Sequence, residues 1–217
     1  MPYGRDDYLK DLGDSSMPHI RSRERFRDFY DELGRDPVQQ AQTCQLERLA
    51  FVEPRGRIIE LGCHIGFNLV HYARQGFQID GVDVSEVLLR EAEEMVAKES
   101  AEVGGRIKLI QAFIEDLPAD PKYETVLLLE TLEHVIDPLP IVLKASEILA
   151  PDGRIFLSAP STRVGTYSHV RGISVDEAIG LCHQANLSIE AAYSENWQNA
   201  YRNTYVIARH REGNPGP

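Results

Sequence analysis

A glycine turn between an apolar strand and a helix constrains this chain more than any other feature. The strand is expected over 57–61 and contains Glu60, and it leads through Gly62 and Gly66 into a helix expected over 66–74. Glycine has no Cβ atom, so the backbone of such a turn can bend sharply and approach a ligand closely. The pattern therefore predicts a parallel strand that presents a small ligand to the N-terminus of a helix.

A second apolar run over 77–83 ends in Asp83, and Val84 follows it. A glycine turn with an acid at the end of the next strand is typical of a nucleotide or nucleoside site, where the acid accepts hydrogen bonds from both ribose hydroxyls. The dinucleotide-binding pattern would need two further glycines, but His64 and Phe67 occupy those positions. The sequence therefore favours a nucleoside ligand over a dinucleotide.

Strands and helices alternate along the rest of the chain, as in an α/β protein. Further strands are expected over 106–111, 124–129, 154–159, 187–194 and 202–209, and further helices over 22–33, 38–52, 86–99, 138–149 and 174–185. Ser85 is the expected N-cap of the helix over 86–99, and Pro151 opens a turn before the strand over 154–159. The last two strands have no long connection between them, so we expect an antiparallel hairpin that completes a seven-stranded sheet.

Composition limits the class of protein. With 217 residues and 42% hydrophobic content, the chain is expected to build one main core, preceded by an N-terminal arm with lid helices over 1–52. No apolar run reaches about 18 residues and no leader pattern is present, which predicts no contact with a membrane. The cysteines at 44, 63 and 182 are interpreted as reduced thiols of a cytoplasmic protein. The net charge of −11 argues against a nucleic-acid partner, and the arginines within 21–27 are interpreted as a solvated segment or a local basic face.

The glycine turn resembles the first motif of class I S-adenosylmethionine-dependent methyltransferases, E/D-x-G-x-G-x-G. Here it stands as Glu60-x-Gly62-x-x-x-Gly66, with His64 in place of the middle glycine. Four later segments support the resemblance in the same order. The first is 111–118, which resembles the segment that lines the adenine, and the second is 130–138, which is similar to the L-E-H-V-x-D-P signature of ubiquinone-biosynthesis-type O-methyltransferases. The third is 149–160, which resembles L-K-P-G-G-x-x-x-x-S-x-P, and the fourth is 169–171, His-Val-Arg, which precedes a capped helix in the same enzymes.

The resemblance covers residues 56–209 and implies a methyltransferase domain over 53–211. It implies a Rossmann-like seven-stranded sheet in the order 3-2-1-4-5-7-6, with the last strand antiparallel and helices on both faces. It also implies S-adenosylmethionine as the cofactor. The expected contacts are Glu60, Gly62, His64 and Gly66 for the methionine end, Asp83 and Val84 for the ribose, Phe113 and Ile114 for the adenine, and Glu130 for the methyl-transfer zone. Phe113 is interpreted either as a ring beside the adenine or as a core residue.

His134 is the first candidate for a general base, because the ordinary pKa of histidine suits proton transfer near neutral pH. It follows the fourth strand, at the carboxyl edge where open α/β sheets bind ligands, and Glu133 stands beside it. His169 is the second candidate, on a loop expected over the same edge. A role in capping or in ordering the loop stays open for both histidines.

A divalent cation is the alternative to a base. Glu130, Glu133 and His134 have the spacing i, i+3, i+4, which would place all three on one face of a helical turn. His169 is a further candidate ligand. Such a set would hold Mg²⁺ or Mn²⁺ and lower the pKa of an acceptor hydroxyl, as in the metal-dependent 2′-O-methyltransferases of small-RNA ends that it resembles.

The sequence thus predicts methyl transfer to a hydroxyl of a small metabolite, with sugars, quinols and phenolic or polyketide products all open. Trp197 and Tyr201, in the terminal hairpin, are candidates for an acceptor pocket. Two other functions stay open, namely a non-catalytic S-adenosylmethionine-binding subunit and an RNA 2′-O-methyltransferase. The sequence does not distinguish a monomer from a homodimer.

Overall fold

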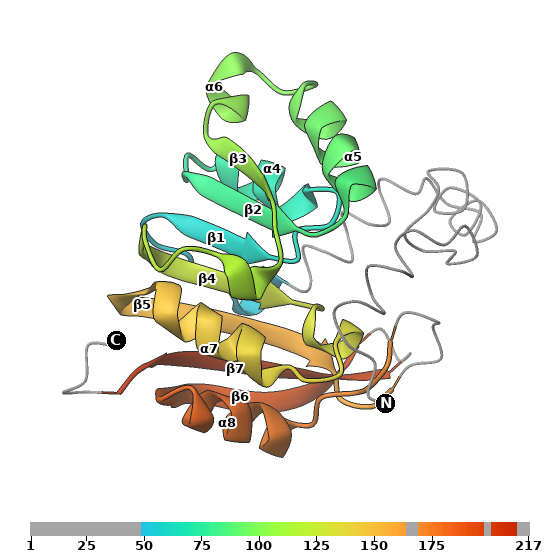
Figure 1. Ribbon diagram of the computed structural model, residues 1–217, viewed down its shortest axis with the longest axis vertical. Coiled ribbons are helices and arrows are strands. Elements are labelled where there is room, and N and C mark those ends of the chain that lie inside the picture. The colour runs from blue at the N-terminus through green and yellow to red at the C-terminus, as the bar shows by residue number, and fades with distance from the viewer. Residues whose placement is uncertain (1–48, 164–168, 198–200, 212–217) are drawn as a thin grey trace.

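The sheet that the sequence predicts is present in the computed structural model, which describes residues 49–163, 169–197 and 201–211. Its seven strands lie in the order β3-β2-β1-β4-β5-β7-β6 (Figure 1). Strand β7 runs antiparallel to both of its neighbours, whereas the other neighbouring pairs are parallel. The α/β class, the strand order and the antiparallel strand are therefore confirmed.

The element bounds follow the alternation read from the sequence. The strands are β1 (Ile58–Leu61), β2 (Ile79–Asp83), β3 (Ile107–Gln111), β4 (Tyr123–Leu129), β5 (Leu149–Pro160), β6 (Leu187–Trp197) and β7 (Tyr201–His210). The helices are α4 (Phe67–Arg74), α5 (Glu86–Val96), α6 (Ala101–Gly104), α7 (Leu139–Ile148) and α8 (Val175–Gln184). Short 3-10 helices are η1 (Leu49–Phe51), η2 (Ile114–Asp116) and η3 (Leu132–His134).

Helices cover both faces of the sheet, and the central strand β4 sends buried side chains to each face (Figure 1). Val126 and Leu128 belong to the core cluster that includes α7 and α8. Leu127 and Leu129 belong to the cluster that includes α4 and α5. Because both faces are covered, residues 126–129 of this strand are apolar at every position, as is usual for a parallel strand in the middle of a sheet.

The region after β2 differs from the prediction in one respect. Ser85 is the N-cap of α5, as expected, and its Oγ accepts a hydrogen bond from Leu88 N at 3.3 Å. The helix ends at Val96, however, and the chain then forms the separate short helix α6. Ser100 caps α6 by accepting a hydrogen bond from Val103 N at 3.3 Å. The helix predicted over 86–99 therefore ends three residues early, and α6 is an additional helix that the sequence analysis did not predict.

The turn expected at Pro151 is wrong, because the chain passes through this position as part of β5. The register between β4 and β5 shifts between Tyr123 and Thr125, and this irregularity takes up the extra residues. Gly153 allows the close approach, since a Cβ atom there would lie 3.0 Å from the carbonyl oxygen of Tyr123.

Several expectations fall on residues that the structure does not describe. The helix over 22–33 lies outside the described residues, as does the helix over 38–52 except for η1. Trp197 and Tyr201 face each other in the register of β6 and β7, but their side chains are outside the description.

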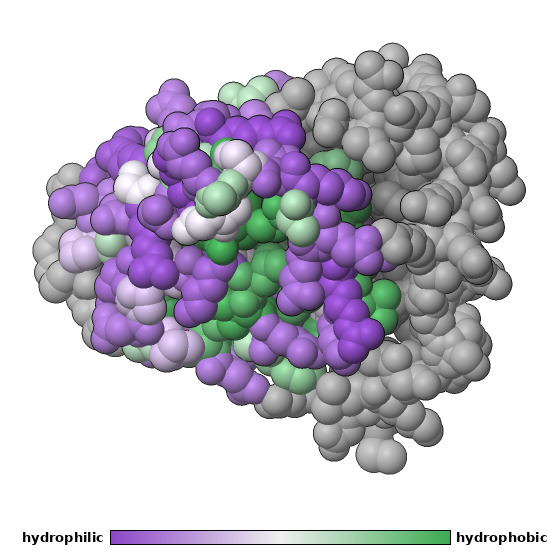
Figure 2. Space-filling model, turned by 90° about the horizontal axis from the view of Figure 1, so that it is seen from above, coloured by the Kyte–Doolittle hydropathy of each residue, from purple (hydrophilic) through white to green (hydrophobic). Residues whose placement is uncertain are grey.

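No described helix has the length and apolar character to cross a membrane. Figure 2, a view from the end with β3 and α5, shows a mainly hydrophilic surface around a hydrophobic strip.

Candidate active site

The carboxyl ends of β1, β2 and β4 bring the predicted cofactor residues together, with Gly62 at the first turn. Gly62 has a φ of 85°, in the left-handed region that favours glycine. A Cβ atom at this position would lie 2.6 Å from Thr131 Oγ1, which itself donates a hydrogen bond to Leu61 O at 2.8 Å. Gly62 therefore lets the turn pack directly on the loop after β4.

Glu60 is a buried carboxylic acid beneath this turn, with 3% of its surface exposed. Its Oε1 accepts a short hydrogen bond from Asn68 Nδ2 of α4, and its Oε2 has no hydrogen-bond partner among the described residues. Burial raises the pKa of Glu60 to about 8, with the nearby Asp83 charge adding to the rise and the Asn68 hydrogen bond opposing it. Glu60 is therefore mainly protonated at neutral pH in the protein alone.

This raised pKa predicts a pH-dependent stability. Between its ordinary pKa and pH 8, Glu60 holds a proton in the folded protein and loses it on unfolding, so the free energy of unfolding should fall as the pH rises through this window. Glu60→Gln imitates the protonated acid and should remove the slope, giving a higher melting temperature than wild type above pH 8. Circular dichroism melts from pH 5 to about pH 9, without cofactor, measure the effect. Parallel curves would contradict it, and Glu86→Gln, at an exposed position of α5, should keep the wild-type slope.

Asp83, at the end of β2, organises both sides of the turn. Its Oδ2 accepts a hydrogen bond from His64 N at 3.0 Å, and its Oδ1 accepts one from Ser85 N at 2.9 Å. Burial raises the pKa of Asp83, while hydrogen bonds from the backbone of Ser85, His64 and Val84 oppose that rise. His64 has a φ of 50°, which explains why a glycine suits this motif position.

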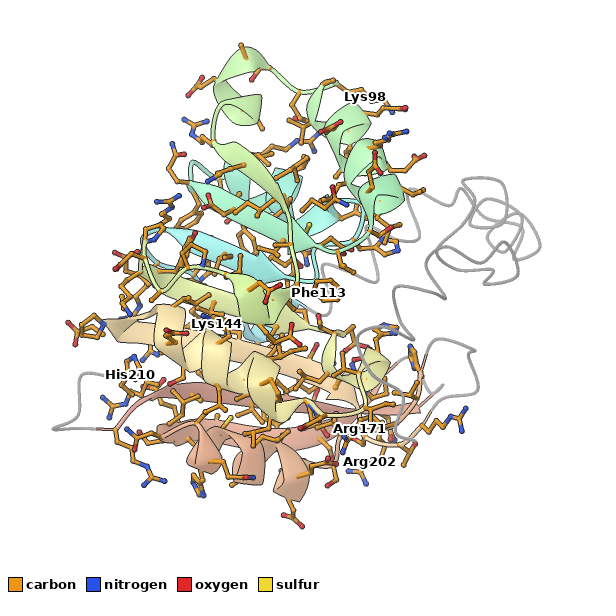
Figure 3. All side chains as sticks on the ribbon, in the orientation of Figure 1. Lys98, Phe113, Lys144, Arg171, Arg202 and His210 are labelled. Carbon is orange, nitrogen blue, oxygen red and sulfur yellow. The ribbon has the colours of Figure 1, made fainter. Side chains whose placement is uncertain are left out.

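The segment predicted to line the adenine follows β3. Ala112 N donates to Asp83 O at 3.2 Å, which places this segment next to the end of β2. Phe113 precedes η2 and is half-buried, and Ile114 is buried in the core cluster of α7 and α8 (Figure 3). The carbonyl oxygen of Val84 accepts a hydrogen bond from Gln111 Nε2 at 3.4 Å. All four predicted ribose and adenine residues thus lie at adjacent strand ends.

Glu130 does not occupy the position predicted for it in a metal-binding turn. It has a φ of 53° and precedes η3, so it is not part of a helical turn with Glu133 and His134. Its Oε1 instead accepts hydrogen bonds from Ser158 Oγ and Asn203 Nδ2, both at 2.8 Å. The i, i+3, i+4 arrangement is therefore wrong, because the chain leaves β4 in a left-handed conformation.

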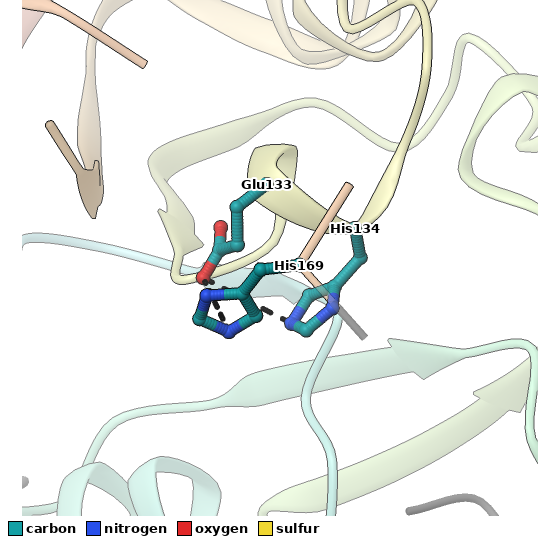
Figure 4. Close-up of side chains that lie close together, drawn as sticks. All are labelled: Glu133, His134 and His169. Carbon is teal, nitrogen blue, oxygen red and sulfur yellow. Dashed lines mark ion pairs between the residues drawn. The ribbon is translucent and has the colours of Figure 1, made fainter. Parts of the chain in front are cut away.

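Glu133, His134 and His169 form the cluster in its place (Figure 4). The Glu133 side chain is fully buried, and its Oε1 lies 3.9 Å from His134 Nε2 and 4.0 Å from His169 Nε2. The two imidazole rings meet edge to face with centroids 4.9 Å apart. One ligand atom from each residue lies within 4.8 Å of the others, which is compatible with a cation between them.

The sequence interpretation assigned no role to the residues that support these groups. Asn68 holds Glu60, Ser158 and Asn203 hold Glu130, and Arg171 holds the segment of His169. Asn68 sits two positions after Gly66, within reach of local pattern reasoning. Ser158 and Asn203 lie 28 and 73 positions from Glu130, and Arg171 bonds to Ile136, 35 positions away, so local spacing carries no information about these pairings.

A buried acid under a glycine turn, followed by a second acid at the end of the next strand, places the chain in the class I S-adenosylmethionine-dependent methyltransferase fold. A family model described as a methyltransferase domain matches residues 35–205. The chain belongs to this methyltransferase-domain family.

Individual relatives agree with this assignment. A ubiquinone biosynthesis O-methyltransferase of Vibrio cholerae is 31% identical over 113 residues, which cover 51% of this chain and 44% of the relative. The protein of the same name from Vibrio vulnificus is 25% identical over 179 residues, covering 73% and 74%. The match to the V. cholerae protein thus spans less than half of that protein's length.

A solved structure supports the fold alone. The glycopeptide N-methyltransferase MtfA in complex with S-adenosyl-L-methionine superposes with a TM-score of 0.65 at 13% identity. The superposition covers 78% of this chain and 93% of that protein. At this identity the likeness concerns the arrangement of strands and helices and does not extend to the acceptor.

Proposed function

We propose that this protein transfers a methyl group from S-adenosylmethionine to a hydroxyl group of a small metabolite. The observation that carries the proposal is the buried Glu133 between His134 and His169, at the same sheet edge as the cofactor turn. O-methylation needs a group that takes the hydroxyl proton or stabilises the alkoxide, and this cluster is suited to either task.

The residues at β1 and β2 fit the cofactor. Glu60 Oε2 is buried and has no hydrogen-bond partner among the described residues, so a cationic amino group nearby would stabilise its charged form. Gly62 lets the backbone approach a ligand closely, and Asp83 retains lone pairs for ribose hydroxyls beside its backbone donors. S-adenosylmethionine, when bound, supplies an electrophilic methyl group on a sulfonium.

In the base form of the proposal, an imidazole of the cluster accepts the acceptor's hydroxyl proton. Glu133 then stabilises the imidazolium through its charge, because a buried carboxylate interacts strongly with a nearby cation. His134 has 39% of its side chain exposed and His169 has 14%, so His134 is the more accessible of the two to an acceptor. Glu130, fixed by Ser158 and Asn203, borders the same edge and would orient the acceptor.

In the metal form of the proposal, Glu133, His134 and His169 hold a divalent cation. One carboxylate and two imidazoles suit Mn²⁺ better than Mg²⁺, which prefers oxygen ligands. The cation would lower the pKa of a hydroxyl bound to it. Both forms of the proposal use the same three side chains, and they differ in their response to a chelator.

A small hydroxylated acceptor is supported by three observations. The curated relatives are ubiquinone biosynthesis O-methyltransferases, which points to quinol-like and phenolic hydroxyls as first candidates. The net charge of −11 opposes a nucleic-acid acceptor. Three carboxylates at the carboxyl edge of the sheet, Asp83, Glu130 and Glu133, disfavour an anionic acceptor through like-charge repulsion.

The test is methyl transfer to a panel of quinols, phenols, sugars and amines, with and without a chelator and added Mg²⁺ or Mn²⁺. Turnover of a hydroxyl compound is expected. Loss of turnover with chelator and recovery with one ion would support the metal form, and chelator-resistant turnover would support the base form. Methylation of amines alone would contradict the proposal. Cofactor binding without any turnover would favour a non-catalytic subunit, and salt-dependent RNA methylation would favour an RNA substrate.

A further inference from the structure

Arg171 connects the segment that carries His169 with two neighbouring parts of the fold (Figure 3). Its Nη1 donates a hydrogen bond to the carbonyl oxygen of Ile136 at 2.6 Å, two residues after His134. Its Nη2 donates to Glu177 Oε1 in the first turn of α8. One guanidinium thus joins the loop after β4, the segment before α8, and α8 itself.

Backbone hydrogen bonds on either side of Arg171 hold the same segment. Val170 N donates to the carbonyl oxygen of Glu133 at 2.9 Å, and Ile173 N donates to that of Pro160 at 2.8 Å. Arg171 lies between these two contacts in sequence, and its side chain supplies the third attachment. The position of this segment is therefore set by long-range contacts, since it has no helix or strand of its own.

The histidine cluster depends on this arrangement because its members come from separate parts of the chain. His134 ends a single 3-10 turn, and His169 lies in the irregular segment before α8. Their Nε2 atoms meet the same oxygen of Glu133 at 3.9 and 4.0 Å. A displacement of about 1 Å in a catalytic group can cost about 100-fold in rate.

We propose that Arg171 is a positioning residue that holds the His169 imidazole in place beside Glu133 and His134. Its hydrogen bond to Ile136 fixes the separation of the two histidine-bearing segments, and its bond to Glu177 fixes the direction of the guanidinium. The inference rests on the proposed function, because Arg171 acts only through the histidine cluster. A half-exposed ion pair with Glu177 contributes little to the free energy of unfolding by itself. The loss of Arg171 should therefore appear mainly in kcat.

Arg171→Gln is expected to lower kcat by about 10- to 100-fold, the usual range for residues that orient active-site ligands. The dissociation constant of S-adenosylmethionine should stay within about twofold of wild type, because the cofactor turn is built by other elements. Arg154→Gln is the matched control. Arg154 forms a similar ion pair with Glu190, at 2.5 and 3.3 Å, between β5 and β6, and its loss should leave kcat unchanged. Equal losses of kcat in the two variants would overturn the inference.

A double-mutant cycle separates positioning from a general structural role. If Arg171 acts through His169, Arg171→Gln should slow the His169→Gln enzyme much less than it slows wild type. Fully additive losses would overturn the inference. The failure of the proposed function gives a different pattern, in which His169→Gln alone leaves kcat unchanged.

A measurement without turnover completes the test. In the ¹⁵N-labelled full chain, Arg171→Gln should shift the imidazole signals of His134 and His169, and Arg154→Gln should leave them in place. Unchanged imidazole signals in Arg171→Gln would overturn the inference even if the residual activity of His169→Gln were too low to measure.

Discussion

Glu133→Gln should reduce kcat by about 100- to 10,000-fold, the range that proton-transfer groups usually contribute. The substitution keeps the size of the side chain and removes its charge. The Glu133 carboxylate is fully buried, with imidazole nitrogens of His134 and His169 at 3.9 and 4.0 Å. A neutral amide can neither stabilise an imidazolium there nor serve as an anionic ligand to a cation. Both forms of the proposed mechanism therefore predict the loss.

Cofactor binding provides the internal control for this variant. Because Glu60, Gly62 and Asp83 lie in β1, in the turn after it and in β2, calorimetry should give a dissociation constant for S-adenosylmethionine within about threefold of wild type. Glu147→Gln, on α7 and paired with Lys144, should keep full activity. A Glu133→Gln enzyme with wild-type kcat would exclude the cluster from catalysis and leave it a structural role.

Local patterns were sufficient for most of the fold. Within the strand predicted over 124–129, residues 126–129 are all apolar, and they pack alternately into the two core clusters. This continuous apolar run therefore predicted a strand inside the sheet. Capping residues such as Ser85 act on their own helix and are therefore visible in sequence. The turn predicted at Pro151 is wrong because this segment pairs with β4 as part of β5, with a shift in register. That pairing involves a strand distant in sequence, so local patterns do not show it.

The cofactor end of the site was predictable for the same reason, and the histidine cluster only in part. Glu60 and Asp83 are placed by the strands in which they lie, and Gly62 by the turn that directly follows β1. Glu130 was misplaced because helical spacing was assumed for a segment that leaves β4 with a φ of 53°. The contact of His169 with Glu133 is made possible by the bond from Val170 N to Glu133 O, between residues 37 positions apart, and local periodicity carries no information about such a pairing.

Asp83→Ala should weaken S-adenosylmethionine binding by about 100-fold or more, because hydrogen bonds to a charged group contribute about 1.5–3 kcal/mol each. The substitution removes the acceptor proposed for the ribose hydroxyls. It also releases His64 N and Ser85 N, whose bonds to Asp83 at 3.0 and 2.9 Å hold the glycine turn against the start of α5. Two losses therefore combine, one of direct contacts and one of the shape of the turn.

Isothermal titration of the apo variant with the cofactor measures this effect. Glu86→Ala is the matched control, since it removes a carboxylate three positions along the chain that contacts Arg90 at the surface of α5. It changes the net charge by the same amount, so any general electrostatic attraction of the cationic cofactor is affected similarly. Equal losses in the two variants would mean that charge alone governs binding. A larger loss in Asp83→Ala would support the prediction that the cofactor binds at the end of β2, where Asp83 also holds the glycine turn.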